Sequence, residues 1–458
     1  MESQKTIFIT VSEGSIARNI LRSFVLERLL AVPDLRILLL VLEEKAERYR
    51  SEFASPRVSV YSFSPRPQSF LDRIIFFLGR NGLCTDTVLT DQRTYAVESG
   101  KWISFVCKRV FTLTLGRLSL FHSCVRLIAR VRPPTAEMRT LFQKEKPDLL
   151  FSTDVQDELD IDAMRAARRE RVRIVSMVRS WDNLTSHHLI QIVPDTLVVW
   201  SSYIKEKAVR LHGIPARRVV ITGIPHFDWY RREGILTTRA AFLEPYGISP
   251  EEKVILFAGI GDFLAPHEAE VVHILSDAIR DGALPKNTRV LFRPHPNFLV
   301  AREEIKELPH VVFDDAVAHY TGALRSTWEM DTEKIAHLAN SLAHADVVVT
   351  TASTMAMDAA AFDKPIVCVA FDGLSTEGYW HSVRRYYEVY THFQLITKTQ
   401  GFAVAYNPKE LIDAILSYFR DPERDGAGRQ RICNEFIGPL DGHAGERVAN
   451  VIIDALRK

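Results

Sequence analysis

Short apolar runs alternate along the chain with longer segments in which apolar residues recur at helical spacing. In the first half, the expected strands are 6–11, 36–42, 58–63, 148–152, 173–178 and 196–200. Helical patterns follow the first two runs, at 16–30 and 43–53. Consecutive Val, Ile and Leu residues separated by helices are typical of parallel sheets that helices cover on both faces. The first half therefore predicts a parallel α/β domain.

A second series of apolar runs begins after Gly247. Its expected strands are 253–258, 289–293, 311–313, 346–350 and 365–370, again with helical segments between them. A chain of 458 residues is too long for one core, because domains usually contain ~100–200 residues. We therefore expect an α/β protein with two Rossmann-like, doubly wound parallel-sheet domains. The predicted bounds are 1–225 for the N-terminal domain, 226–250 for a linker with Pro and Gly, and 251–458 for the C-terminal domain.

One segment, 64–134, departs from this alternation and is predicted to be a helical insertion in the N-terminal domain. Its second half, 101–132, has seven Lys and Arg residues and no Asp or Glu. On a helical wheel, four of these cations fall within roughly 40° of one another: Lys101, Lys108, Arg126 and Arg130. Gly116 interrupts the pattern, so it is compatible with one helix or with two. The segment is interpreted either as a solvated insertion or as a basic amphipathic surface for an anionic membrane or a lipid-linked substrate.

Composition and charge narrow the class of protein. Hydrophobic residues make up 47% and charged residues 25%, which excludes a mainly disordered or collagen-like chain. The 58 basic and 57 acidic residues nearly cancel, so no overall field attracts nucleic acid. The five scattered cysteines favour free thiols in a reducing cytosol, and no apolar stretch reaches the ~20 residues of a membrane span. The first residues read as a buried strand and not a signal peptide, so we expect a cytoplasmic protein, peripheral at the inner face of the membrane if the basic segment binds lipid.

The most informative candidate site follows the run at 346–350. The strand leads into a hydroxyl-rich turn, and a helix is expected to begin at Ser353 or Thr354. A helix N-terminus exposes unpaired N–H groups and a positive dipole end, which bind phosphate oxygens. Asp358, about one turn into the helix, could accept hydrogen bonds from a ribose diol. The alternative is that Ser353 only caps the helix.

Two further loops lie at predicted strand ends in the C-terminal half. After strand 289–293 the sequence reads Arg293-Pro-His295-Pro, where two prolines hold the loop and the arginine is suited to phosphate. After strand 253–258, Gly259 and Gly261 would let the backbone approach a ligand closely, although a tight turn explains them as well. Ligands of open parallel sheets bind beyond the carboxyl ends of the strands. Both loops are therefore candidate parts of a nucleotide site, with His295 as a candidate catalytic residue.

Two loops at strand ends in the N-terminal half contain candidate residues for the acceptor side. The loop after strand 6–11 contains Ser12, Glu13 and Gly14. The loop after strand 173–178 contains Arg179, Trp181, Asp182 and Asn183. Asp182, or else Glu13, could act as a general base if its surroundings raise the pKa of its carboxyl group. The alternative for these residues is turn and capping chemistry.

Neither a metal site nor a common catalytic motif is indicated. Asp160-Ile-Asp162 has the spacing of a metal-binding DxD motif, but it falls in a helical pattern, where residues two apart point in different directions. His187 and His188 are adjacent, so their rings diverge on a regular element. No GxSxG, HExxH or P-loop motif occurs. We therefore expect no bound metal and no cofactor.

The C-terminal motifs together resemble those of GT-B fold glycosyltransferases, in the branch related to CDP-glycerol glycerophosphotransferases and UDP-N-acetylglucosamine 2-epimerases. The resemblance is carried by Arg293-Pro-His295-Pro, the turn and helix 350–358, Lys364-Pro365 and the segment 441–447. It is good over 253–458 and mainly topological before that. It implies two Rossmann-like domains that face a cleft, with the nucleotide on the C-terminal domain.

The resemblance also implies roles for individual residues. The turn at Ser353 and Thr354 falls where the family binds the nucleotide diphosphate, and His295 falls near the diphosphate or the reaction centre. Asp358 falls where many GT-B enzymes have a ribose-binding Glu, whose side chain is one methylene longer. Enzymes of this fold generally need no bound metal for their chemistry.

We therefore expect a metal-independent glycosyltransferase with a nucleotide-activated donor. It would transfer a sugar or polyol-phosphate unit to a cell-surface polysaccharide or a lipid-linked acceptor. Two alternatives remain: a UDP-sugar 2-epimerase-like isomerase on the same fold, and a non-catalytic GT-B scaffold. The basic segment argues against the isomerase, because a small soluble substrate does not require it. Intact Arg293, His295 and Ser353 argue against the scaffold.

Overall fold

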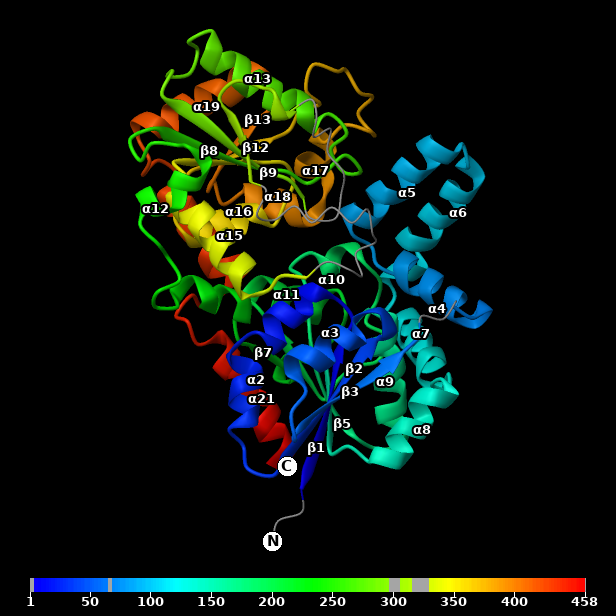
Figure 1. The fold of residues 1–458 in the computed structure, drawn as a ribbon. Coiled ribbons are helices and arrows are strands. Elements are labelled where there is room, and N and C mark those ends of the chain that lie inside the picture. The colour runs from blue at the N-terminus through cyan, green and yellow to red at the C-terminus, as the bar shows by residue number, and fades with distance from the viewer. Residues whose placement is uncertain (1–3, 65–67, 296–304, 315–328, 458) are drawn as a thin grey trace. The chain divides into compact units, whose positions relative to one another are not determined.

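The computed structural model describes residues 4–64, 68–295, 305–314 and 329–457 (Figure 1). The chain forms two compact units. The first consists of Met1–Asp228 together with Asp441–Lys458, and the second of Trp229–Leu440. Each contains one parallel sheet with helices on both faces, which confirms the predicted fold class. None of the helices in the described ranges is long and apolar enough to span a bilayer.

The first unit is built on a sheet that has seven strands among the described residues. They are β1(Lys5–Val11), β2(Leu35–Leu42), β3(Val58–Phe63), β4(Leu149–Ser152), β5(Arg173–Met177), β6(Thr196–Val199) and β7(Val219–Ile221). Their order is β3-β2-β1-β4-β5-β6-β7, and every neighbouring pair is parallel. Ile7 in β1 is in register with Ile37 on one side and Leu149 on the other. The order changes direction between β1 and β4.

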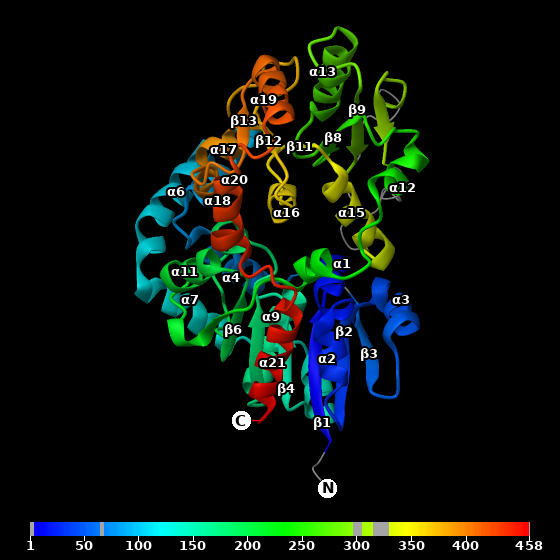
Figure 2. The ribbon, with the colours of Figure 1, turned by 90° about the vertical axis from the view of Figure 1, so that its left-hand side faces the viewer.

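Helices bury both faces of this sheet. On one face, side chains such as Phe8, Leu150 and Ile174 form a core with α8(Ala136–Glu145) and α9(Glu158–Arg169). On the other, α2(Phe24–Leu30) lies beside the last helix, α21(Ala444–Arg457), as Figure 2 shows. This unit also contains α1(Gly14–Ile16), α3(Glu43–Phe53), α10(Asn183–Ser186) and α11(Ser202–Arg210).

The last helix belongs to the first unit, whereas the predicted C-terminal domain extended to residue 458. Apolar residues of α21, among them Val448 and Ile452, are buried. Asp228 accepts hydrogen bonds from the backbone N–H groups of Ala444 (3.0 Å) and Gly445 (2.7 Å) at the start of the helix. Burial against α2 and this capping carboxylate explain why the chain returns to the first sheet.

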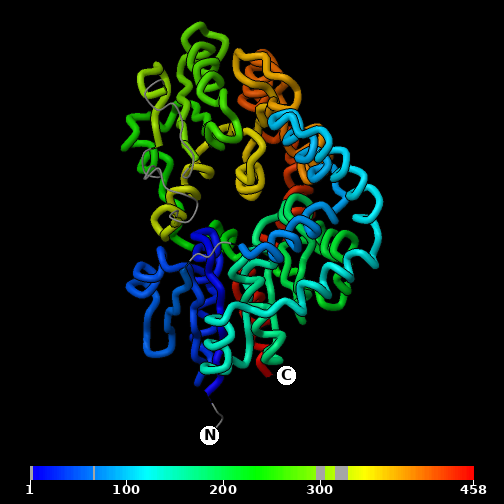
Figure 3. The backbone as a smooth tube through the Cα atoms, turned by 90° about the vertical axis from the view of Figure 1, so that its right-hand side faces the viewer, coloured from blue at the N-terminus to red at the C-terminus, as the bar shows by residue number. Residues whose placement is uncertain are grey.

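The segment between β3 and β4 forms a series of helices, which Figure 3 traces in blue and cyan. These are α4(Phe70–Asn81), α5(Asp86–Ser99), α6(Trp102–Leu113) and α7(Ser119–Val131). Residues 101–132 thus form two helices, joined by a 3-10 turn that contains Gly116. A Cβ atom on Gly116 would lie 3.0 Å from the carbonyl oxygen of Asn81, so the close approach of the chain favours glycine there.

The four cations that the sequence grouped on one face do not have the same surroundings. Lys101 and Arg130 are exposed, and the ammonium group of Lys108 lies 4.9 Å from the ring centre of Tyr95. Arg126 is different, because its guanidinium donates to the carbonyl oxygens of Ile190 (3.0 Å) and His212. Burial also lowers the pKa of Arg126. The prediction that Arg126 belongs to a membrane-facing set is therefore wrong: its charge is used inside the first unit.

The second unit has a sheet of six strands among its described residues. They are β8(Lys253–Ala258), β9(Thr288–Arg293), β10(Val311–Phe313), β11(Val347–Thr350), β12(Ile366–Val369) and β13(Ala403–Ala405), in the order β10-β9-β8-β11-β12-β13. All neighbouring pairs are parallel. Here the order changes direction between β8 and β11.

Helices also cover both faces of the second sheet. Phe257, Val349 and Val367 belong to a core with α13(Glu268–Arg280) and α19(Pro408–Arg420). On the other face, α15(Thr332–His344) and α16(Met355–Ala361) contact β8, β11 and β12. This unit also contains α12(Arg239–Leu243), α17(Arg384–Val389), α18(Thr391–Thr397) and α20(Gly426–Ile432).

Candidate active site

Each sheet has one point where its strand order changes direction, and ligands of open α/β sheets bind at such points, beyond the carboxyl ends of the strands. In the first unit this point lies between the loop after β1, which contains Glu13, and the loop after β4, which contains Asp154. In the second unit it lies between the loop after β8 and the turn after β11. Residues predicted from the sequence occur at both points.

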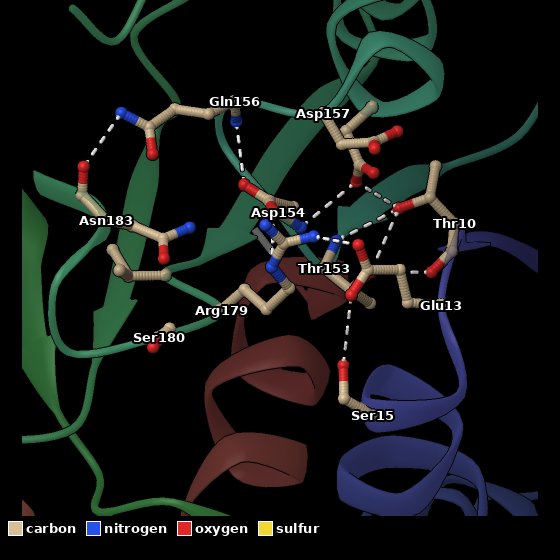
Figure 4. Close-up of polar contacts among 12 residues, drawn as sticks. Thr10, Glu13, Ser15, Thr153, Asp154, Gln156, Asp157, Arg179, Ser180 and Asn183 are labelled. Atoms are coloured by element: carbon tan, nitrogen blue, oxygen red, sulfur yellow. Dashed lines mark hydrogen bonds and ion pairs between the residues drawn. The ribbon is translucent and has the colours of Figure 1, made fainter. Parts of the chain in front are cut away.

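At the first point, three strand-end loops meet through charged side chains. The Arg179 guanidinium, from the loop after β5, donates to Glu13 (Nη1–Oε1 2.7 Å). Its Nε lies 3.1 Å from Oδ2 of Asp154. Figure 4 shows the guanidinium between these two carboxylates. Burial disfavours the charge of Arg179, but the two neighbouring carboxylates raise its pKa.

Two more carboxyl groups, those of Asp157 and Asp160, lie next to this cluster. Burial, reinforced by the charge of Asp154, raises the pKa of Asp157 to about 7. Asp160 is fully buried and accepts hydrogen bonds from Thr10, from Ser152 (2.8 Å) and from the backbone of Asp154 (3.1 Å). Burial raises the pKa of Asp160 well above its usual value. The carboxyl groups of Glu13, Asp154 and Asp157 therefore act on one guanidinium, Asp160 lies behind Asp154, and the arrangement favours at least one bound proton.

A cavity of about 490 Å³ adjoins this cluster at the carboxyl end of the first sheet. Five carboxyl groups line it, those of Glu13, Asp72, Asp157, Glu158 and Asp162, together with the guanidinium groups of Arg165 and Arg179. Its size is typical of small-molecule sites, which occupy ~300–1,000 Å³. Asp72 and Phe76 come from α4, so the helical insertion forms part of its wall.

Asp182, the first candidate base in the sequence, is engaged within its own turn. Its carboxylate accepts hydrogen bonds from the hydroxyl groups of Ser180 (2.6 Å), which precedes α10, and Ser186 (3.0 Å), the last residue of α10. This is the turn chemistry considered as the alternative. Trp181 is 2% exposed and packs near Tyr203, with ring centres 6.5 Å apart. It forms part of the core and offers no exposed ring to an acceptor.

The other predicted acceptor-side residues are buried near the cluster. Gly14 lies inside α1. Ser12 and Asn183 are 3% and 1% exposed, and Ser12 Oγ and Asn183 Nδ2 have no hydrogen-bond partner among the described residues. Among the candidate residues of the N-terminal half, Glu13 and Arg179 form a side-chain ion pair.

In the second unit, the glycine loop after β8 is already occupied by a side chain. The backbone N–H groups of Ile260 and Gly261 donate to Glu268 Oε2 (2.6 and 3.2 Å). A Cβ atom on residue 259 would overlap the Glu268 carboxyl group, so glycine is required there. Burial raises the pKa of Glu268 to about 7. The close approach predicted from Gly259 and Gly261 is thus made by the protein's own carboxyl group.

Arg293 ends β9 in a buried cluster. Its guanidinium donates to Asp314 Oδ2 (2.9 Å), and Oδ1 of the same carboxylate lies 2.6 Å from His337 Nε2 and accepts from Tyr246 (3.0 Å). Although burial opposes it, the bond with His337 and the charge of Arg293 keep the pKa of Asp314 low. His295 follows two residues later and is partly buried. Pro296, the last residue of that motif, lies outside the described residues.

The turn after β11 presents hydroxyl groups at the start of α16. Thr354 is exposed, and Ser353 Oγ accepts a hydrogen bond from the backbone of Met355 (3.2 Å). Asp358 is 7% exposed and accepts a hydrogen bond from the hydroxyl group of Tyr230 (2.6 Å). The sequence placed Tyr230 in the linker and gave no indication of this contact.

Sequence reasoning missed Asp154, Asp157, Tyr230, Glu268 and Asp314. Asp154 and Asp157 directly follow the strand predicted at 148–152, so the strand-end rule could have identified them. Tyr230 and Asp314 depend on contacts between residues distant in the sequence, and Glu268 on the way its helix folds back on the preceding loop. Asp160 and Asp162 lie in α9 and point to different partners, Thr10 and Thr135, as expected for a helical DxD sequence.

Solved structures with a similar fold include a glycosyltransferase and two UDP-GlcNAc 2-epimerases. A glycosyltransferase from Rickettsia africae ESF-5 has 11% sequence identity and a TM-score of 0.52, with 100% of both chains covered. The UDP-GlcNAc 2-epimerase of Neisseria meningitidis, bound to UDP-GlcNAc, has 10% identity and a TM-score of 0.55, covering 98% of this chain and 100% of that one. The UDP-GlcNAc 2-epimerase of Methanocaldococcus jannaschii has 12% identity and a TM-score of 0.53, covering 98% and 99%. At such low identity these likenesses show the fold alone.

The family of this chain follows from a comparison of its sequence with models of protein families. No curated protein gives a significant match. Residues 176–454, more than half of the chain, match the family model of CDP-glycerol:poly(glycerophosphate) glycerophosphotransferase. This range includes the loops after β8, β9 and β11, and it confirms the resemblance seen in the sequence motifs. The chain therefore belongs to the CDP-glycerol:poly(glycerophosphate) glycerophosphotransferase family and is a transferase of the glycosyltransferase type.

Proposed function

We propose that this chain transfers a sugar or polyol-phosphate unit from a nucleotide-activated donor to a hydroxyl group of a cell-surface polysaccharide or lipid-linked acceptor. The observation that supports this most is the family match, which extends across the whole candidate donor side. A related fold that binds UDP-GlcNAc in the Neisseria enzyme is consistent with a nucleotide-sugar donor. The proposal needs no bound metal.

The donor nucleotide is proposed to bind at the switch point of the second unit. Ser353 and Thr354 would donate hydroxyl hydrogen bonds to the diphosphate, and Asp358 would accept from the ribose, with Tyr230 holding its carboxylate in place. Arg293 and His295, at the end of β9, would stabilise the negative charge that develops on the leaving nucleotide. The loop that contains Gly259 and Gly261 would form part of the wall of the donor site. The N–H groups of Ile260 and Gly261 would not bind the donor, because they already donate to Glu268.

Glu13 is proposed as the general base that takes the proton of the acceptor hydroxyl group. Its carboxylate lines the cavity of the first unit, where an acceptor has room. Asp182 is the weaker choice, because Ser180 and Ser186 already donate to its carboxylate. Arg179, which donates to Glu13 Oε1 at 2.7 Å, would hold the carboxylate in its orientation.

The insertion is proposed to rest on an anionic membrane. Of the 21 large apolar side chains that are exposed in the described residues, 17 lie between Phe70 and Val131. In α7, Val125 and Ala129 are buried in the core, while Leu120 and Leu127 are exposed. The helix therefore has apolar side chains on its outer face as well as on the face that packs against the core. Exposed apolar residues beside lysine and arginine fit the interface of an anionic lipid layer.

A thermal-shift experiment with UDP, CDP, GDP, dTDP and CMP tests the donor site. We expect one nucleotide to stabilise the wild type, by ~2.7 kcal/mol when its concentration is 100 times its dissociation constant. The double variant Ser353→Ala/Thr354→Ala should fold and lose most of this shift, while Thr140→Ala, an exposed threonine of α8, should keep it. Equal shifts in the wild type and the double variant would remove the turn from the site.

Turnover of the His295→Ala variant tests the role of that residue. Loss of one electrostatic or acid–base group typically costs at least ~100-fold in turnover, and we expect a loss of this size with nucleotide stabilisation retained. Conversion of a nucleotide sugar in the absence of any acceptor would instead favour the epimerase reaction. Normal turnover of the variant would reduce the loop after β9 to a structural role.

A further inference from the structure

The cavity of the first unit has a marked imbalance of charge. Its two guanidinium groups are already paired: Arg165 with Asp72 (2.9 Å), and Arg179 with Glu13 (2.7 Å) and Asp154. The other carboxyl groups of the wall, those of Asp157, Glu158 and Asp162, form no ion pair with these guanidinium groups, although burial raises the pKa of Asp157 to about 7 and also raises that of Asp162. An anionic ligand would therefore meet a wall of the same sign, and like charges brought close together cost several kcal/mol.

The wall also has polar atoms that are suited to a neutral ligand. Gln156 and Arg165 are 6% and 8% exposed, and each keeps one atom without a hydrogen-bond partner among the described residues, Oε1 and Nε respectively. Both side chains line the cavity. One is an acceptor and the other a donor, and a hydroxyl group can satisfy both kinds. Buried polar atoms without partners are costly, so a ligand that supplies the missing bonds gains affinity.

Apolar side chains complete the wall. Phe63, Phe76 and Ile161 line the cavity together with the carboxyl groups. Sugars and polyols present C–H groups on some faces and hydroxyl groups on others, and they suit a wall of this mixed kind. A phosphate group has neither feature.

We propose that this cavity binds the terminal sugar or polyol unit of the acceptor as a neutral, polyhydroxylated group, and that it excludes phosphate. The inference rests on the proposed transferase function and specifies its acceptor end. Glu13 lines the same cavity, so a hydroxyl group of the bound unit lies within the same chamber as the proposed base. If the acceptor is a chain with phosphodiester links, its first phosphate lies outside the cavity.

Ligand-observed NMR with the full chain tests this assignment. The neutral probes are glycerol, sorbitol and methyl glucoside, and the anionic probes are glycerol 3-phosphate and inorganic phosphate. We expect the wild type to bind at least one neutral probe ~10-fold or more tightly than glycerol 3-phosphate, because the carboxyl groups repel the phosphate. Gln156→Leu should weaken the neutral probe by ~5-fold or more, because it removes a buried acceptor.

A charge variant separates selectivity from folding. Glu158 is an exposed residue that lines the cavity, so Glu158→Lys should fold and should increase binding of glycerol 3-phosphate relative to glycerol. Glu98→Lys, the same change at an exposed site in α5, should leave the ratio unchanged.

Three outcomes would overturn the proposal: equal binding of phosphate and neutral probes by the wild type, no binding of any neutral probe, or an unchanged ratio in Glu158→Lys. The nucleotide thermal shift is measured on the same samples. A retained nucleotide shift together with a failed acceptor test would overturn only the cavity assignment. Loss of both would overturn the transferase proposal as well.

Discussion

Glu268 is a buried carboxyl group that accepts hydrogen bonds from two backbone N–H groups of the loop after β8. Its other oxygen, Oε1, has no hydrogen-bond partner among the described residues. Burial disfavours the charged form more than the two bonds favour it, and the pKa of Glu268 rises from 4.5 to about 7. The protonation state of this one residue therefore affects the stability of the loop at the candidate donor site.

The stability of the protein should consequently depend on pH through Glu268. Between pH 4.5 and about 7 the folded state holds this proton and the unfolded state releases it, so the free energy of unfolding falls as pH rises. Each pKa unit corresponds to ~1.4 kcal/mol, which makes the loss due to Glu268 about 3 kcal/mol across this window. We expect Glu268→Gln to lack this part of the pH dependence.

Urea unfolding of the wild type and Glu268→Gln at about pH 4 and about pH 8 measures the effect. Other buried acids, such as Asp157 and Asp160, also titrate, so the informative quantity is the difference between the two proteins. Glu410→Gln, in α19, serves as a control because its carboxylate is exposed. The same pH dependence in wild type and Glu268→Gln would contradict the prediction.

At the scale of elements, the helices of the insertion combine two roles. Ile75 of α4, Val88 of α5 and Val125 of α7 are buried in the core of the first unit. Ile103 of α6 and Leu120 of α7 are 84% and 73% exposed. Helices on the surface of water-soluble proteins normally expose polar residues on the face that points away from the core. The apolar outer residues are the physical reason to expect a lipid contact.

Sedimentation with anionic vesicles tests this expectation. Each cation near an anionic surface contributes ~1 kcal/mol, and salt screens the attraction. The triple variant Lys101→Gln/Lys108→Gln/Arg130→Gln should therefore bind ~10–100-fold more weakly than the wild type at low salt. Arg126 stays unchanged, because it holds two carbonyl oxygens of the first unit.

Two further variants separate charge from apolar contact. Ile103→Ser/Leu120→Ser should reduce vesicle binding at low and high salt alike. Arg28→Gln/Lys144→Gln/Arg210→Gln, which removes three exposed cations elsewhere in the first unit, should bind as the wild type does. A wild type that does not sediment with anionic vesicles at low salt would end the membrane proposal and leave a solvated insertion.

At the scale of the whole molecule, the chain leaves the first unit at Asp228 and returns to it at Asp441. Asp228 itself accepts from the first N–H groups of α21. Arg447 of α21 donates to the carbonyl oxygen of Thr222 (2.8 Å). The points where the chain leaves and re-enters the first unit are thus held together by hydrogen bonds within that unit.

Asp228→Ala should weaken the attachment of α21. Two buried N–H groups would lose their acceptor, which costs about 1–3 kcal/mol. Hydrogen exchange should show faster exchange in α21 and in its neighbour α2, with little change in α13 and α19 of the second unit. Asp413→Ala, an exposed residue of α19 that pairs with Lys409, is the control. Unchanged protection of α21 would show that its apolar face alone attaches it.

The sequence by itself determined most of the strands and helices and the points where the strands end. Runs of consecutive apolar residues are needed wherever a parallel strand is covered on both faces, so the central strands of both sheets were evident. Of the three edge strands with three residues, β10 was predicted at 311–313, whereas β7 and β13 were missed. The strand ends then indicated Glu13, Arg179, Arg293 and the turn at Ser353, since parallel strands align their carboxyl ends.

Only the tertiary structure decided how those side chains are used. Asp182 accepts hydrogen bonds from serines of its own turn, and Arg126 donates to backbone carbonyl oxygens. Glu268 accepts from the backbone of the glycine loop after β8. Helix α21 returned to the first sheet. The physical reason is that a buried polar group needs a partner, which can be nearby in the sequence, as for Asp182 and Glu268, or far away, as for Arg126. Local patterns report which residues are polar and where strands end, but not which distant groups fold against them.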